Sequence, residues 1–347
     1  MNRTKNIVLN DIDALLITSQ SNLFYFTGYA NADAVLIIGS CESYYISDDR
    51  VKEEFEELCS DITFVSIDMG QTYYAKAVEI LKELRAKVVG YEEDYILFKH
   101  YVLFDEFFDM IRYSNQISDL RSIKDFFEIE QIVLAQKITD EVFQNVLDYI
   151  RPGITELELA SYINSNIFAL GGSLAFDTIV AFGRNTSKPH AHPGKEILQK
   201  NDIVTIDFGA KYNGYCSDMT RSFCIGKPTN EYLDTYNLVL GAQTNAINKM
   251  NAGLTGKAID ALARNYFPSN LASFFTHSLG HSLGIDIHER PNLSPLFAGV
   301  INENVVTSIE PGLYFPGEYG IRIEDIVIVK KSGAQNLTKS SKQLIII

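Results

Sequence analysis

Short apolar segments alternate with amphipathic ones through the first third of the chain. The apolar segments are rich in β-branched and aromatic residues, which predicts strands at 14–18, 34–38, 43–46, 62–65 and 87–90. The amphipathic segments predict helices at 49–58, 72–84 and 98–111. Strands that alternate with helices are typical of an α/β domain with a mixed sheet, and the polar stretch 113–116 is expected to end this domain.

A long amphipathic pattern follows Asp125. Its apolar residues recur mostly every three or four positions up to Ile150, which predicts one long helix that Arg151-Pro152-Gly153 stops. Thr155 and Glu158 then form a capping box, the signature of a second helix, which is expected to end at Gly171-Gly172. A strand is predicted at 176–182.

The same order of elements recurs further along the chain. A helix is predicted from Thr229 to Met250, and Gly253-Leu254-Thr255 begins another helix as Gly153-Ile154-Thr155 did before. Each helix pair is followed by a pair of strands, first at 201–223 and then at 304–330. The order of elements therefore predicts two related halves, each with a helix pair and a strand pair.

Both strand pairs carry two acids on one face. Side chains alternate along a strand, and a turn at Tyr212-Asn213 would set Asp207 opposite Asp218, whereas a turn at Asn213-Gly214 would set them on a diagonal. Either register leaves the two carboxylates roughly 5 to 8 Å apart.

In the second pair, a loop centred on Gly317 sets Glu310 opposite Glu324. The acids could simply decorate a solvated sheet face. If the halves face each other, however, the carboxylates converge and repel, and two divalent cations would compensate their charge.

Composition and charge restrict the classes of partner. The 347-residue chain has a formal net charge of −14, which argues against nucleic acid or an anionic membrane as the main partner. No apolar run is long enough to span a membrane, and the start of the chain lacks a secretory signal pattern. The sparse cysteines favour free thiols in a reducing cytoplasm, so we expect a cytoplasmic protein.

Together, these residues resemble the pita-bread metallopeptidases of the Xaa-Pro branch, aminopeptidase P and prolidase. The resemblance runs from Leu120 to the end of the chain, and the preceding domain has the size and position that this family expects. It implies an α+β fold, in which a creatinase-like α/β domain at 1–118 precedes a pita-bread domain at 119–347 with a curved antiparallel sheet covered by helices. The expected metal ligands are Asp207 in IDFGAKYNGY, Asp218 in SDMTRSF, His281 in HSLGHSLG, Glu310 in SIEPGLY and Glu324 in GIRIED.

The resemblance also implies roles around the metals. Glu310 is expected to move the proton, and His190 and His288 to hold the scissile carbonyl. His277 is expected to shape the substrate pocket, and Arg322 to orient a carboxylate ligand. The chain departs from the family at Ser282, where glycine is usual.

The implied activity is hydrolysis of the Xaa-Pro bond to release the N-terminal residue of a peptide, with two divalent ions per chain. Oxygen ligands with one imidazole favour Mn²⁺, although Co²⁺ or Zn²⁺ could occupy the site. The partners expected are a peptide substrate with proline in second position and a second copy of the chain in a homodimer. Prolidase, an Xaa-Pro dipeptidase, is the alternative activity, and a non-catalytic peptide-binding module of the same fold is a more distant one.

Overall fold

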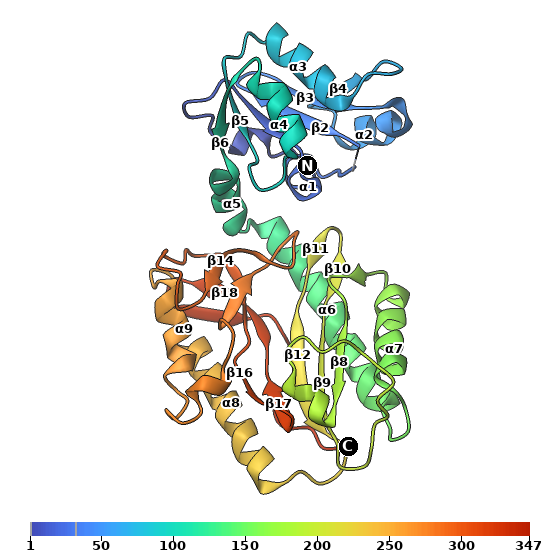
Figure 1. Cartoon of the computed structure of the whole chain (residues 1–347), viewed down its shortest axis with the longest axis vertical. Coiled ribbons are helices and arrows are strands. Elements are labelled where there is room, and N and C mark those ends of the chain that lie inside the picture. The colour runs from blue at the N-terminus through green and yellow to red at the C-terminus, as the bar shows by residue number, and fades with distance from the viewer. Residues whose placement is uncertain (1, 32) are drawn as a thin grey trace. The chain divides into compact units, whose positions relative to one another are not determined.

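The structure is a computed structural model that describes residues 2–31 and 33–347, and the chain divides into two units, Met1–Arg121 and Ser122–Ile347 (Figure 1). In the first unit, six strands form one sheet in the order β4-β3-β2-β1-β5-β6. The strands are β1 (Ala14–Ile17), β2 (Val35–Gly39), β3 (Ser43–Ser47), β4 (Thr63–Ser66), β5 (Val88–Tyr91) and β6 (Asp109–Arg112). β1 pairs antiparallel with β2 and parallel with β5, which confirms the predicted mixed sheet.

The helices of this unit depart from the sequence prediction at three places. They are α1 (Gln20–Thr27), α2 (Lys52–Leu58), α3 (Tyr73–Glu83), α4 (Phe98–Asp105) and α5 (Ser114–Ser122). The helix predicted at 98–111 was wrong beyond Asp105, because 109–112 instead pair with β5 as strand β6. Helices α1 and α5 were not predicted, and α5 begins at Ser114, within the polar stretch 113–116.

The second unit contains the two predicted helix pairs. They are α6 (Phe126–Tyr149) with α7 (Glu156–Ala169), and α8 (Asn230–Lys249) with α9 (Gly256–Arg264). Asp125 and Thr155 each form the N-terminal capping box that their sequences indicate. Such boxes satisfy backbone N–H groups that the first helical turn leaves without partners, so the helix starts are fixed locally.

The two halves also repeat in their backbone contacts. Gly153 N donates to Leu198 O over 2.9 Å, and Gly253 N donates to Ile301 O over the same distance. Both glycines have a positive φ, 99° and 98°, which residues with a Cβ rarely adopt. The duplication predicted from the order of elements is therefore present in the fold.

The strands of the second unit lie between the two helix pairs (Figure 1). In the first half they are β7 (Ser173–Leu174), β8 (Ile179–Phe182), β9 (Ile203–Phe208), β10 (Ala210–Tyr212), β11 (Tyr215–Cys216) and β12 (Met219–Cys224). In the second half they are β13 (Gly280–Ser282), β14 (Glu289–Leu293), β15 (Val306–Ile309), β16 (Gly312–Phe315), β17 (Tyr319–Arg322), β18 (Asp325–Lys330) and β19 (Gly333–Asn336). Each half packs its helices and strands around a hydrophobic cluster of its own.

Polar groups join the two halves where β12 meets β17 and β18. Ser222 Oγ donates to Arg322 O over 3.1 Å and accepts from Arg322 N over 3.1 Å. Glu324 N donates to Thr220 O over 3.2 Å. We call this junction the seam; it brings strands that are about a hundred residues apart in sequence into contact. Every helix within residues 2–31 and 33–347 is too short or too polar to span a bilayer.

Candidate metal centre

The first hairpin adopts one of the two registers that the sequence allowed. Its turn is Asn213-Gly214, because Tyr212 pairs with Tyr215, and both turn residues have a positive φ. A two-residue turn of this kind matches the twist of the flanking strands. Asp207 consequently pairs with Thr220, and Asp218 lies two residues away along the opposite strand, on the diagonal.

The second strand pair has the register predicted for it. Val306 pairs with Ile328 on one side of a short gap, and Gly312 pairs with Arg322 on the other. The register is unchanged across the gap, so Glu310 and Glu324, which lie within it, stand opposite each other. Neither acid belongs to a strand.

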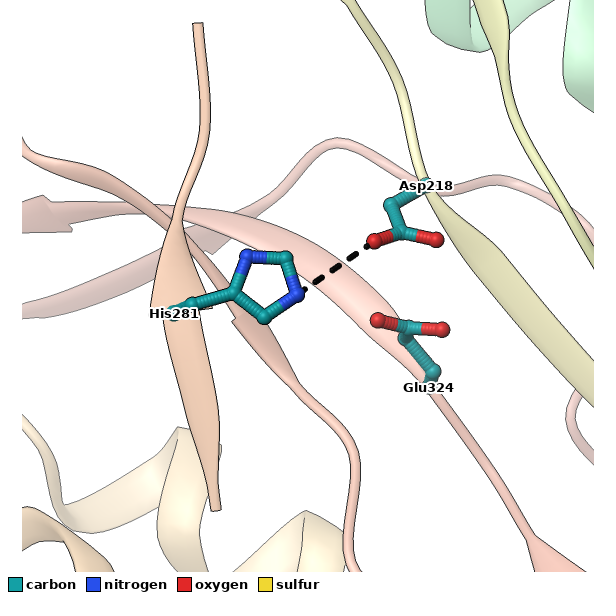
Figure 2. A group of neighbouring side chains, drawn as sticks. All are labelled: Asp218, His281 and Glu324. Carbon is teal, nitrogen blue, oxygen red and sulfur yellow. Dashed lines mark ion pairs between the residues drawn. The ribbon is translucent and has the colours of Figure 1, made fainter. Parts of the chain in front are cut away.

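All five expected ligands line a single cavity of about 330 Å³. His281 Nε2 lies 3.6 Å from Asp218 Oδ2 and 3.4 Å from Glu310 Oε1. One ligand atom each from Asp218, His281 and Glu324 lies within 4.8 Å of the other two. Figure 2 shows these three side chains pointing toward one another; His281 comes from β13, and Asp218 and Glu324 come from the residues just before β12 and β18.

Burial and mutual repulsion disfavour the ionised forms of Asp218, Glu310 and Glu324. Burial, with the charges of Glu324 and Asp207, holds the pKa of Asp218 well above its usual range. Burial does the same for Glu324, helped by Glu310, and raises the pKa of Glu310 to about 7. Burial also lowers the pKa of His281 to about 4, so its imidazole is neutral at pH 7 and can act as a ligand.

Arg322 is the protein cation in this cluster. It donates to Asp207 Oδ2 over 2.6 Å, to Thr220 Oγ1 over 2.9 Å and to the Tyr314 hydroxyl over 2.8 Å. Burial disfavours its charge, but Tyr314, Asp207 and Glu310 hold the pKa of the guanidinium above its usual range. A single guanidinium cannot balance the carboxylates of Asp207, Asp218, Glu310 and Glu324.

The donor set fits divalent cations. Asp207 Oδ1 is buried and has no hydrogen-bond partner among the described residues, which is costly for a carboxylate oxygen unless a cation binds it. The available donors are carboxylate oxygens and one imidazole, a set that suits hard or borderline divalent ions. Thr220 Oγ1 donates to Glu324 Oε2 over 2.7 Å, and Ser308 Oγ donates to Glu310 Oε1 over 3.1 Å. These hydrogen bonds from neighbouring hydroxyl groups orient both carboxylates.

Three further histidines expected from the sequence line the same cavity, namely His190, His277 and His288. The His288 ring lies 4.3 Å from the His281 ring, at 66° to it. His277 Nε2 lies 2.9 Å from the Tyr314 hydroxyl, and burial lowers the pKa of His277 to about 4.

Sequence analysis missed three polar residues that support this site, Thr220, Ser308 and Tyr314. Thr220 and Ser308 each lie two positions from an acid of the cluster and bond to a carboxylate there. Tyr314 lies four positions after Glu310 and connects Arg322 with His277. Even spacing along a strand keeps side chains on one face, so this alternation could have identified all three.

The apolar wall of the cavity includes Phe176, Ile179 and Ile287. Phe176 lies outside strand β8, which begins only at Ile179, so the strand predicted at 176–182 is shorter than expected.

Comparison with known proteins covers nearly the whole chain. A sequence model of metallopeptidase family M24 matches residues 130–331, and one of the creatinase/prolidase N-terminal domain matches residues 5–123. The chain is 33% identical to an Xaa-Pro dipeptidase of Pyrococcus horikoshii, over 97% of this chain and 95% of that protein.

Two solved structures align with TM-scores of 0.93. One is an Xaa-Pro dipeptidase from Bacillus anthracis, 34% identical, and the alignment covers 97% of this chain and 95% of that one. The other is an X-Pro aminopeptidase from Thermotoga maritima, 31% identical, with both chains fully covered. These matches confirm the fold class predicted from the sequence.

Proposed function

This chain belongs to metallopeptidase family M24, and from that premise we propose that it is an Xaa-Pro aminopeptidase. It would hydrolyse the bond that precedes proline in second position and release the N-terminal residue. The observation that carries the proposal is the cluster of acids with His281 in one cavity, where burial and repulsion favour the neutral acids unless cations bind. Proline lacks an amide N–H, so a substrate of this kind needs a dedicated site.

We propose that Asp207, Asp218, His281, Glu310 and Glu324 hold two divalent cations, with Mn²⁺ as the first choice. When bound, such cations polarise a carbonyl and make water a stronger acid. The protein would contribute the arrangement of ligands and the exclusion of bulk water. Asp207 is oriented by Arg322 and Glu324 by Thr220, so neither carboxylate is free to rotate.

Glu310 is the proposed proton carrier. In the metal-free protein burial raises its pKa to about 7, so the environment of this carboxyl group allows it to hold a proton near neutral pH. Its carboxylate would take a proton from the attacking water and deliver it to the proline nitrogen as the C–N bond breaks. His190 and His288 would donate hydrogen bonds to the scissile carbonyl oxygen as it becomes negative, and His277 would shape the pocket.

Prolidase is the second candidate, and the likeness to Xaa-Pro dipeptidases at 33% and 34% identity supports it. The two activities differ in whether a residue follows the proline. We therefore propose assaying the Mn²⁺-supplemented protein against Ala-Pro-Ala, Ala-Pro and Met-Ala-Ser. Preferred cleavage of Ala-Pro-Ala would support the aminopeptidase, and cleavage of Ala-Pro alone would identify a prolidase.

Cleavage of Met-Ala-Ser in preference to both proline peptides would refute the proposed specificity. Peptide binding without turnover, at less than one metal ion per chain, would instead identify a non-catalytic binding module. Manganese as the physiological metal, a homodimeric assembly and a cytoplasmic location stay predictions.

A further inference from the structure

A buried lysine lies beside the metal centre and has no part in the function described so far. Lys124 is 2% exposed, and lysine is rarely buried to this extent unless it is paired. Its Nζ donates to Glu289 Oε2 over 3.1 Å, to Ser282 Oγ over 3.2 Å and to Ser122 O over 3.4 Å. A buried charge with these partners holds its neighbours in one arrangement.

Two of these partners directly follow histidines of the cavity. Ser282 follows His281 in β13, and Glu289 follows His288 at the start of β14. Glu289 also pairs with Ser282 across β13 and β14, where the register shifts between His281 and Ser282. The side chain of His288, one residue before this anchored position, lines the cavity.

The Glu289 carboxylate also fixes the turn that carries His288. Its Oε1 accepts a hydrogen bond from Asp286 N over 3.1 Å, while Oε2 bonds Lys124. Gly284 N donates to Asp286 O over 3.0 Å, and a Cβ added at Gly284 would come within 2.9 Å of Glu289 Oε2. The carboxylate thus holds the turn at Asp286, while Cys216 N donates to Gly284 O over 2.7 Å and Lys211 Nζ to Ile285 O over 2.8 Å.

Ser282 gives Lys124 a third anchor that a glycine could not provide. Its Oγ donates to Val306 O over 2.8 Å, so a lone pair of that oxygen is available to accept from Lys124 Nζ. The departure from the usual family glycine therefore adds to this network, and it links β13 to β15 behind the site.

We propose that Lys124 is a positioning residue for His288, acting through its ion pair with Glu289. The pair fixes the turn 284–289 and thereby holds the His288 imidazole at the cavity. The inference rests on the proposed function, in which His288 stabilises the negative charge that develops on the carbonyl oxygen. Loss of the pair should then affect the transition state more than substrate binding.

The experiment uses Lys124→Met, which keeps the apolar stem but removes the charge. We expect kcat to fall at least about tenfold with little change in KM or metal content, since a displacement of about 1 Å can cost roughly 10²-fold in rate. The matched control is Lys331→Met, which removes the exposed Lys331–Glu303 ion pair (3.6 Å) and should leave kcat unchanged.

A second variant separates positioning from general stability. Lys124→Met/Glu289→Gln leaves no unpaired buried charge, so we expect its melting temperature to return toward that of the wild type while kcat stays low. Should Lys124→Met alone fail to fold, this double variant carries the same test. Recovery of both stability and kcat in the double variant, or an unchanged kcat in the single one, would overturn the proposal.

A readout independent of turnover distinguishes failure of this inference from failure of the proposed function. In spectra of protein with ¹⁵N-labelled histidine, the His288 signal can be assigned by its absence in His288→Asn. We expect Lys124→Met, but not Lys331→Met, to shift or broaden it. An unchanged signal would refute the positioning role, whereas a wild-type protein that cleaves no Xaa-Pro peptide would refute the proposed function alone.

Discussion

Arg322→Met should destabilise the metal-free protein far more than the loss of an ordinary surface charge. The guanidinium is buried and donates to Asp207 over 2.6 Å, so the substitution leaves a carboxylate without its cation. Removal of one partner from a buried ion pair costs roughly 3–5 kcal/mol. With Mn²⁺ bound, we expect a smaller loss, because the metal charge replaces part of what the guanidinium supplied.

The assay is urea unfolding at pH 8, with chelator or with excess Mn²⁺. Arg50→Met is the control, because it removes an exposed pair in which Arg50 Nη2 also lies 2.6 Å from a carboxylate oxygen, that of Asp48. Exposed pairs contribute little to stability, so we expect this control to unfold as the wild type does in both conditions.

The same substitution should also change the pH dependence of turnover. Arg322 lowers the pKa of Glu310, so its loss should raise that pKa further and move the acid limb of the kcat/KM profile to higher pH. A loss of stability below about 1 kcal/mol in the metal-free protein, together with an unmoved acid limb, would refute the electrostatic account of the cluster.

Further predictions concern the proton carrier, the carbonyl contact and the metal-free state. Glu310→Gln should reduce kcat by roughly 10²- to 10⁴-fold, and retained turnover would exclude it as the base. His288→Ala should reduce kcat by roughly 10²- to 10³-fold with metal content unchanged, whereas lost metal would reassign it as a ligand.

After chelation, the stabilisation by protonated Glu310 is complete below its unfolded pKa of 4.5 and is lost as pH rises to its folded pKa of about 7. The pKa values of Asp218 and Glu324, raised well above their usual range, extend this loss of stability to higher pH. The pKa values of His277 and His281 are lowered from 6.5 to about 4, so these histidines oppose the loss of stability only below pH 6.5. Thermal melts in which stability rises between pH 6.5 and 8.5 would contradict the prediction.

Local signals made most of the second unit predictable from the sequence. The start of α6 is set by Asp125 and that of α7 by Thr155, each through contacts within four residues. The Asn213-Gly214 turn was one of only two candidates, but both satisfy the same alternation, so packing had to choose between them.

The first unit was harder to predict from the sequence where strand pairing overrides the local pattern of apolar residues. Residues 109–112 continue the apolar spacing of α4, yet pairing with β5 makes them a strand. Helix α1 has its apolar residues in one consecutive run, Leu23 to Phe26, so its sequence has no clear helical period. The convergence of acids from two halves likewise depends on the seam at β12, which no local pattern encodes.

The central claim is that the acids of the two halves form one cluster around two cations. It is tested most directly by anomalous diffraction at the manganese absorption edge from crystals grown with Mn²⁺. We predict two anomalous peaks per chain within bonding distance of Asp207, Asp218, His281, Glu310 and Glu324. A map without a peak among these five side chains, with the carboxylates turned apart, would contradict the account.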